Sequence, residues 1–301
     1  LKLNLIFFLS GVAALLFEGL WFRQLGLTFG NSVWGATMVL TSFMAGLALG
    51  NFLTIRLGYR LQDLRKAYIV LELIIGLTGA LIVLVLPHLP TLFANLLGQF
   101  IHVPWLLNSL RLMLSFFLLA IPTTAMGATL PVMVKLLSQS NDNFGAVLGK
   151  FYGWNTLGAV TGALLGELLL IKALGIQNTG FFAAFLNLSA AVFVLKNFPS
   201  RPNQNPVLLP ASNAGEQSFS LDEKRILVVS FLTGSIMLAL EVVWFRFLLL
   251  SMSGTSLIFV IMLAIILLGI SLGGLTASRL CKKKPDQFAY LEVILILNGL
   301  I

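Results

Sequence analysis

Cysteine and charge are both scarce in this sequence of 301 residues. Cys281 is the single cysteine, which excludes an intrachain disulfide framework and any CxxC metal or redox motif. Charged residues make up only 10% of the chain, against about 25% in ordinary globular proteins. Hydrophobic residues make up 58%. This balance excludes an ordinary water-soluble protein and predicts an all-α polytopic integral membrane protein.

Hydrophobic runs of about 20 residues, the length that crosses a bilayer, divide the chain. A stretch rich in Pro, Asn and Ser interrupts them and predicts a cytoplasmic linker over 199–224. We therefore expect a first six-helix membrane repeat over 1–198 and a partial second repeat of three helices over 225–301. The expected spans lie near 5–28, 33–57, 67–88, 106–134, 145–172, 178–197, 226–250, 256–280 and 287–301. The amphipathic stretch 91–105 is too short to cross and predicts a short interfacial helix.

Lysine and arginine are concentrated in alternate loops. The net charge of +8 would suit nucleic acid, but most basic residues fall in short loops between spans, where they govern orientation. Loops after even-numbered spans are basic and those after odd-numbered spans are nearly free of lysine and arginine. This pattern places the N-terminus in the cytoplasm, with membrane lipid rather than nucleic acid as the partner.

An octet from the first span recurs in the seventh. "EGLWFRQL" at 18–25 and "EVVWFRFL" at 241–248 share Glu, Trp, Phe and Arg, and a shift of 223 residues aligns 8–57 with 231–280 at 16 identical positions of 50. Glu18, Trp21 and Arg23 thus correspond to Glu241, Trp244 and Arg246.

Six spans separate the two copies, so both run in the same direction through the membrane. That is the parallel repeat of a major-facilitator-like transporter, with six helices and an incomplete second half of about three. Because the sequence begins with Leu and ends within a span, we expect a fragment.

Four segments carry a family resemblance: "GVAALLFEGLWFRQLGLTFG", "FMAGLALGNF", "PTTAMGATLPV" and "GKFYGWNTLGAVTGALLGELLLIKALG". They resemble the membrane region of bacterial proteins described as fused major-facilitator and spermidine-synthase-like proteins. The resemblance implies location in the bacterial inner membrane and, elsewhere in such proteins, a soluble aminopropyltransferase-like domain that binds decarboxylated S-adenosylmethionine through a Gly-rich loop after a strand. These residues contain no such loop, so we expect no enzymatic activity within them and no cofactor.

The stretch "GNFLTIRLGYR" at 50–60 resembles the gating motif of major facilitators. Gly50, Arg56, Gly58 and Arg60 fit that motif, whereas Ile55 occupies the position of its usual Asp.

The charges inside the repeated octet need partners, because a charge near the bilayer centre costs at least about 2.5 kcal/mol. Glu and Arg five residues apart differ by about 140° around a helix, too far for an easy pair within it. Cross-pairing of Glu18 with Arg246, and of Glu241 with Arg23, is more natural.

Two interpretations of the octet stay open. It could form a structural clamp between the halves, with Trp21 and Trp244 as interfacial anchors. Alternatively, Glu18 and Glu241 face a central cavity and bind a cation or proton, with the Trp faces adding cation–π attraction.

Other polar and small residues carry weaker signals. Glycines at four-residue spacing in the fifth span predict close helix packing: Gly158, Gly162 and Gly166. Asn155 is expected to bond a neighbouring helix rather than line a vestibule, and Glu72 to be tied to basic residues near the cytoplasmic surface. No catalytic group or metal-ligand cluster is apparent.

The leading functional hypothesis is therefore a transporter-like membrane domain for a small organic cation such as a polyamine. The alternative is a non-transporting scaffold that anchors a soluble domain or serves a larger membrane complex, with other membrane subunits or a second copy of the chain as partners. A polar cavity reaching Glu18 favours the first. A bundle packed shut with both Glu–Arg pairs formed favours the second.

Overall fold

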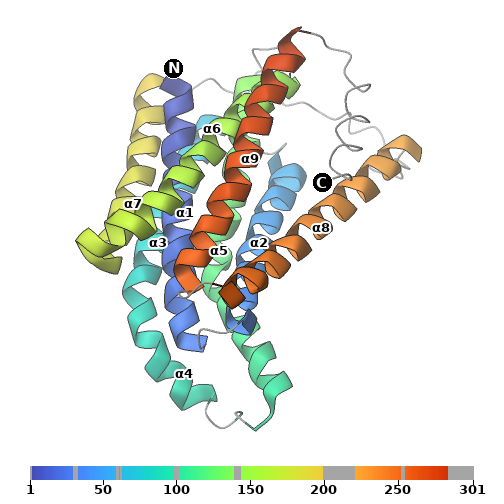
Figure 1. Ribbon diagram of the computed structural model, residues 1–301. Coiled ribbons are helices and arrows are strands. Elements are labelled where there is room, and N and C mark those ends of the chain that lie inside the picture. The colour runs from blue at the N-terminus through green and yellow to red at the C-terminus, as the bar shows by residue number, and fades with distance from the viewer. Residues whose placement is uncertain are drawn as a thin grey trace.

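The computed structural model describes residues 2–29, 33–58, 61, 63–97, 100, 102–138, 144–198, 221–251 and 255–283. Within these ranges every element is helical (Figure 1). The elements are α1 (Lys2–Phe29), α2 (Val33–Leu57), α3 (Leu64–Val85), the 3₁₀ turn η2 (Leu86–His88), α4 (Leu89–Leu97), α5 (Pro104–Ser138), α6 (Phe144–Leu165), the π-helical turn η4 (Gly166–Leu170), α7 (Ile171–Asn197), α8 (Leu221–Ser251) and α9 (Thr255–Lys283).

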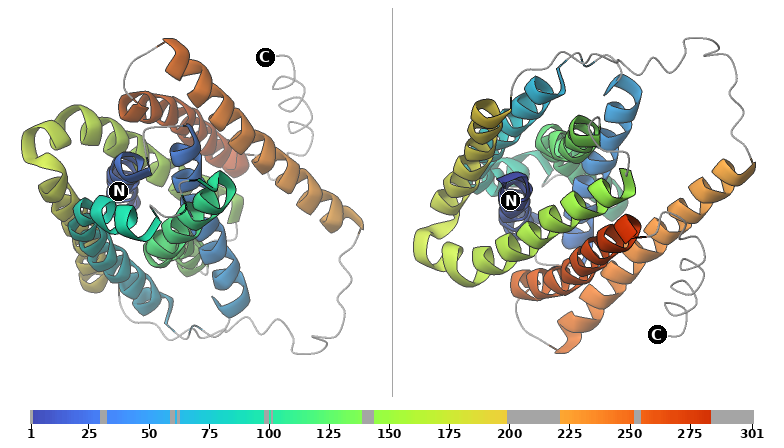
Figure 2. Two further views of the ribbon diagram at one scale, coloured as in Figure 1. Left: turned by 90° about the horizontal axis from the view of Figure 1, so that it is seen from below. Right: turned by 90° about the horizontal axis from the view of Figure 1, so that it is seen from above.

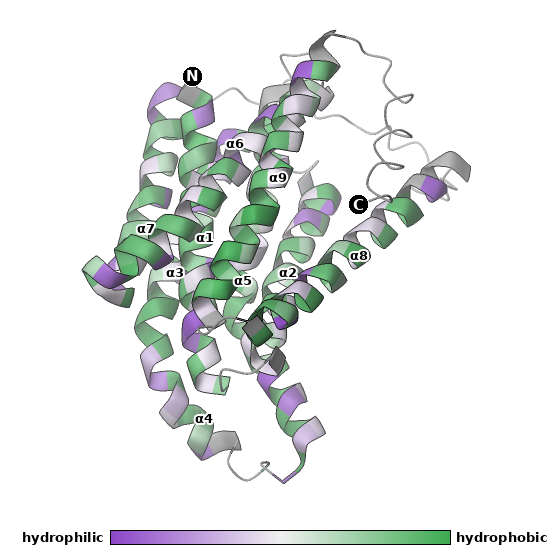
Figure 3. Ribbon diagram, viewed as in Figure 1, coloured by the Kyte–Doolittle hydropathy of each residue, from purple (hydrophilic) through white to green (hydrophobic). Residues whose placement is uncertain are grey.

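Seven helical stretches of the described chain are long and apolar enough to cross a membrane. Hydrophobic residues predominate along them (Figure 3). The expectation of a multi-pass, all-helical membrane protein is thereby supported. The described helices match eight of the nine expected spans; the ninth, 287–301, lies outside the described residues.

One of the seven stretches, Gly145–Asn197, holds two crossings. Its 53 residues would measure about 80 Å as a single straight helix, far more than the hydrocarbon thickness of about 30 Å. The backbone leaves the helical conformation at Gly175, with φ of 78° and ψ of 174°. This region of φ favours glycine, since it lacks a Cβ. The chain reverses there, so that α7 runs antiparallel to α3, with Gly180 against Val83 and Gly76 against Asn187.

Helix α1 lies at the centre of the first six crossings and packs closely on α6. Gly158 lies against Phe8, and a Cβ placed on it would be 2.0 Å from the Phe8 carbonyl oxygen. A Cβ placed on Gly162 would be 2.3 Å from the Val12 carbonyl oxygen, and Gly166 faces the Leu16 side chain. The face that carries these glycines is therefore covered by α1 of the same chain, backbone against backbone at Gly158 and Gly162, with α1 and α6 running in the same direction.

Helix α9 packs antiparallel on the other side of α6. Ser271 Oγ donates a hydrogen bond to the Gly153 carbonyl at 2.8 Å, and Ser278 Oγ donates to the Ala146 carbonyl at 2.7 Å. Helix α8, in contrast, lies at the edge of the bundle (Figure 2). Side chains described over 227–240 are all exposed, and burial begins at Glu241 and Phe245.

The boundaries of the two expected repeats fall partly outside the described residues. Of the linker expected over 199–224, residues 199–220 lie outside them, whereas 221–224 belong to α8. The short helix expected within 91–105 corresponds to α4, which follows α3 through η2.

Candidate functional site

A cavity of about 340 Å³ lies between the first six crossings and the α8–α9 pair. Every long helix of the described chain contributes to its lining. Apolar walls come from side chains such as Phe43, Met44, Met126, Met237 and Ile266. The lining also includes a set of polar side chains: Ser10, Glu18, Thr129, Tyr152, Asn155, Thr156, Asn187 and Glu241. The cavity therefore combines hydrophobic walls with two acidic groups and several hydrogen-bonding groups.

Glu18 and Glu241 are the acidic groups of the cavity. They are only 6% and 7% exposed, and they occupy equivalent positions of the internal repeat. Oε1 of each carboxyl group has no hydrogen-bond partner within the described residues. Acidic side chains inside a membrane normally face protein or water and have a partner. Two such groups around one cavity therefore create a site that attracts positive charge.

The expected cross-pairing of Glu241 with Arg23 is wrong. Arg23 Nη1 instead donates to Glu167 Oε1 at 3.0 Å, and the two groups form an ion pair. Glu167 lies in the π-helical turn after α6, next to the α1 face on which α6 packs. The pair thus joins α1 to the end of α6. Because Arg23 is paired with Glu167, its positive charge does not neutralise the acidic groups of the cavity.

Glu18 likewise lacks the partner expected for it. Arg246 is exposed on α8, and in the part of the chain that the structure describes no ion pair joins it to Glu18. The octet therefore does not form the expected clamp of two reciprocal ion pairs.

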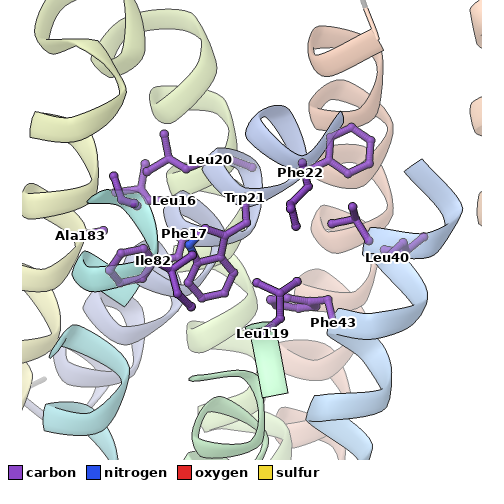
Figure 4. Close-up of a cluster of buried hydrophobic side chains, with 14 of the residues drawn as sticks. Leu16, Phe17, Leu20, Trp21, Phe22, Leu40, Phe43, Ile82, Leu119 and Ala183 are labelled. Carbon is purple, nitrogen blue, oxygen red and sulfur yellow. The ribbon is translucent and has the colours of Figure 1, made fainter. Parts of the chain in front are cut away.

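The two tryptophans of the octet have different environments, and neither lines the cavity. Trp21 is fully buried, stacked on Phe17 at a centroid distance of 5.3 Å and tilted toward Phe43 at 6.4 Å (Figure 4). It is a core residue and not an interfacial anchor. Trp244 is 49% exposed on α8. Of the aromatic rings, those of Phe43 and Tyr152 line the cavity in their place.

The residues that resemble the gating motif lie at the end of α2. A Cβ on Gly50 would meet the Thr124 carbonyl oxygen of α5 at 2.0 Å, so Gly50 permits close packing of the two helices. The Arg56 guanidinium lies over the Phe52 ring at 5.2 Å, and the Gly58 carbonyl accepts a hydrogen bond from Lys135 Nζ at 3.3 Å. Arg60 lies outside the described residues.

An open groove of about 570 Å³ runs beside these gating-motif residues, between α2, α3 and α5. Its lining is almost wholly apolar, and Thr54 turns its hydroxyl to the Gly50 carbonyl of its own helix. Thr124 is the other polar side chain of this lining, and none of the residues that line the groove is charged.

Several cavity residues were not expected from the sequence. Asn155 was expected to pack, yet it lines the cavity together with Tyr152 of the same helix. Asn187 and Ser10 differ from their surroundings in the sequence only by being polar residues inside apolar spans. That property alone could have predicted that they line a cavity. Glu72 was expected to be tied to basic residues, but the partner that the structure gives it is the hydroxyl of Ser10, at 2.8 Å.

No family model matches this sequence, and neither the curated proteins nor the solved structures include a similar one. The resemblance to fused major-facilitator proteins is thus carried by the quoted segments alone. The side chains around the cavity, and not a relative, support the functional proposal that follows.

Proposed function

We propose that this chain is a transporter-like membrane domain that binds a small organic cation, such as a polyamine, in the cavity between its two halves. The single observation that carries the proposal is that Glu18 and Glu241 line one cavity, each with an unsatisfied carboxylate oxygen. Arg23, the cation expected to neutralise one of them, is bound to Glu167 instead. The cavity therefore has acidic groups to offer to a ligand.

The remaining lining suits an elongated amine. Two carboxylates match a ligand with two or more ammonium groups, and methylene segments between those groups would contact the Met and Phe side chains. Tyr152 and Phe43 can add cation–π attraction. A volume of about 340 Å³ falls within the range of about 300–1,000 Å³ found for small-molecule sites.

The same proposal includes a major-facilitator-like arrangement in the bacterial inner membrane with a cytoplasmic N-terminus. Support comes from the directions of the helices: α6 is parallel to α1, whereas α9 is antiparallel to α6. These directions follow from the alternation of successive crossings, and they agree with a parallel repeat in which the first, fifth and eighth crossings are so oriented.

A non-transporting scaffold is the second candidate function. The apolar side chains exposed along the first part of α8 favour it, because they would suit a partner helix or lipid. Against it stand the open cavity at Glu18, the missing reciprocal Glu–Arg pairs and the coverage of the glycine face by α1.

Uptake of labelled putrescine and spermidine into liposomes containing the protein tests the proposal. Wild type should accumulate at least one of the two, and both Glu18→Gln and Glu241→Gln should lose uptake while they remain folded. Asp63→Asn is the matched control, because it makes the same acid-to-amide change at the N-cap of α3, away from the cavity. A folded wild type that moves neither amine would contradict the polyamine proposal and favour the scaffold.

A further inference from the structure

A second polar cluster lies beside the cavity, where α1, α3 and α7 meet. At its centre is Glu72 of α3, which is completely buried. Ser10 Oγ of α1 donates to Glu72 Oε1 at 2.8 Å. Tyr68 lies one helical turn before Glu72 and is 1% exposed, and Asn187 of α7 packs against Gly76 one turn after it. Ser10 and Asn187 also line the cavity, so the cluster is in contact with it.

The cluster contains three buried polar atoms without a hydrogen-bond partner in the described part of the chain. They are Glu72 Oε2, Tyr68 Oη and Asn187 Nδ2. Native structures rarely leave such atoms unsatisfied, and those that remain usually indicate a bound water, an ion or a function. Two of them, Glu72 Oε2 and Tyr68 Oη, belong to side chains that interact with each other, so they point to a proton held between these two groups.

Three cations at this end of the bundle are engaged elsewhere. Arg65 donates to the Leu195 carbonyl, and Lys135 donates to the Gly58 carbonyl. Lys66 Nζ lies 3.8 Å from Asp63 Oδ2, so these two residues form an ion pair. Along α7 no charged residue occurs between Lys172 and Lys196, and along α5 none occurs between Arg111 and Lys135.

The other titratable group that α1 carries toward the cavity is acidic: Glu18, two turns beyond Ser10. Among the side chains that the structure describes, no basic group therefore faces Glu72 from the helices packed around it.

We propose that Glu72 is a proton-binding site that exchanges its proton with the cavity through Ser10. A buried carboxylate without a cation carries a desolvation cost of several kcal/mol, which the neutral acid avoids. In the neutral acid, Oε1 accepts a hydrogen bond from Ser10 as observed, and the Oε2–H group can donate a hydrogen bond to Tyr68 Oη. Residues four apart on a helix share one face, so Tyr68 is placed for that contact.

Ser10 supplies the route because it lines the cavity and its hydroxyl donates to Glu72. When the carboxylate is loaded, the Ser10 O–H proton passes to Glu72 Oε1 and a proton from the cavity replaces it on Ser10 Oγ. Rotation of the neutral carboxyl group then turns its O–H group toward Tyr68 and its free carbonyl oxygen toward Ser10. Unloading is the reverse, so no other reactant is required. The site does not depend on which ligand the cavity binds, and its protonation can be measured without transport.

Infrared spectroscopy of the reconstituted protein tests this site directly. A protonated carboxyl group gives a C=O stretching band that a carboxylate lacks, and the band shifts when the proton exchanges for deuterium. The wild-type-minus-variant spectrum should show this band for Glu72→Gln. Glu72→Asp, which keeps an acid in a smaller side chain, should move the band rather than remove it.

Ser10→Ala tests the route. The band should persist in this variant, but its shift in heavy water should become several-fold slower than in wild type. Ser115→Ala is the matched control, because Ser115 is fully buried and bonds the Arg111 carbonyl of its own helix. Folded Glu72 variants whose spectra equal that of wild type would overturn the proton site. Unchanged exchange in Ser10→Ala would overturn the route, and neither result depends on polyamine uptake.

Discussion

Phe22 and Phe245 occupy equivalent positions of the internal repeat, and their rings meet edge to face with centroids 6.0 Å apart. Phe259 of α9 stacks on Phe22 at 3.8 Å. Glu18 lies one turn before Phe22, and Glu241 one turn before Phe245. The contact between the two rings therefore sets the two acids at the same level of the cavity.

Loss of this aromatic contact should lower the stability of the fold. Phe22→Ala removes a ring that is 6% exposed, and we expect a cost of about 3–5 kcal/mol in the free energy of unfolding. Unfolding in mixed detergent micelles measures that cost. Phe247→Ala is the control, since Phe247 is 65% exposed on α8, and its effect should stay within about 0.5 kcal/mol. Equal effects of the two variants would show that the ring contact does not hold α8.

The close approach of α1 and α6 makes Gly158 sensitive to a single methyl group. Gly158→Ala would place a Cβ 2.0 Å from the Phe8 carbonyl oxygen, so the helices must separate and the melting temperature should fall. Gly19→Ala is the opposite case, because nothing lies within 4 Å of a Cβ there. Alanine is better than glycine in a helix by up to about 1 kcal/mol, so Gly19→Ala should be neutral or stabilising. A melting temperature unchanged in Gly158→Ala would contradict the helix contact.

The Arg23–Glu167 pair should show coupling in a double-mutant cycle. Glu167→Gln leaves a partly buried Arg23 without its counter-charge, and Arg23→Gln leaves the Glu167 carboxylate alone. We expect each single change to lower the free energy of unfolding, and the double change to lower it by less than the sum of the two. Strict additivity would mean that the pair contributes nothing to stability. Polyamine uptake by the double variant then reports whether Arg23 influences the cavity.

The orientation of the chain can be tested by cysteine labelling in a Cys281→Ser background. Lys66→Cys, in the first turn of α3, should react with a membrane-impermeant maleimide from the cytoplasmic side. His102→Cys, in the exposed turn before α5, should react from the opposite side. Right-side-out and inverted membrane vesicles separate the two cases. Labelling of both positions from one side would contradict the orientation inferred from the basic loops.

Much of the fold could be predicted from the sequence because lipid imposes simple rules. A crossing helix needs about 20 apolar residues, so the breaks at Gly, Pro and charged residues located eight described spans. The π-helical turn at Gly166–Leu170 and the reversal at Gly175 were harder to place, since they depend on local backbone conformation.

The candidate site was predictable only in part. The internal repeat identified Glu18 and Glu241 as candidate site residues, but equivalent positions in a repeat do not determine which residues their side chains contact. Arg23 pairs with Glu167, 144 positions away in the sequence, because tertiary packing brings the end of α6 next to α1. Trp21 and Trp244 are identical residues with opposite environments, because helices surround α1 whereas α8 lies at the edge of the bundle. Side-chain environment is a property of the neighbours and not of the motif.

The unequal attachment of the helices around the cavity has a mechanical consequence. On one side, α1 and α6 are joined backbone to backbone at Gly158 and Gly162, and this wall is stiff. On the other side, α8 presents Glu241 and Phe245 to the bundle while its side chains over 227–240 remain exposed, so this wall is compliant. A displacement of α8 would therefore widen the cavity, separate the rings of Phe22 and Phe245 and draw the two acids apart, so that the shape of the cavity and the spacing of its charges change together.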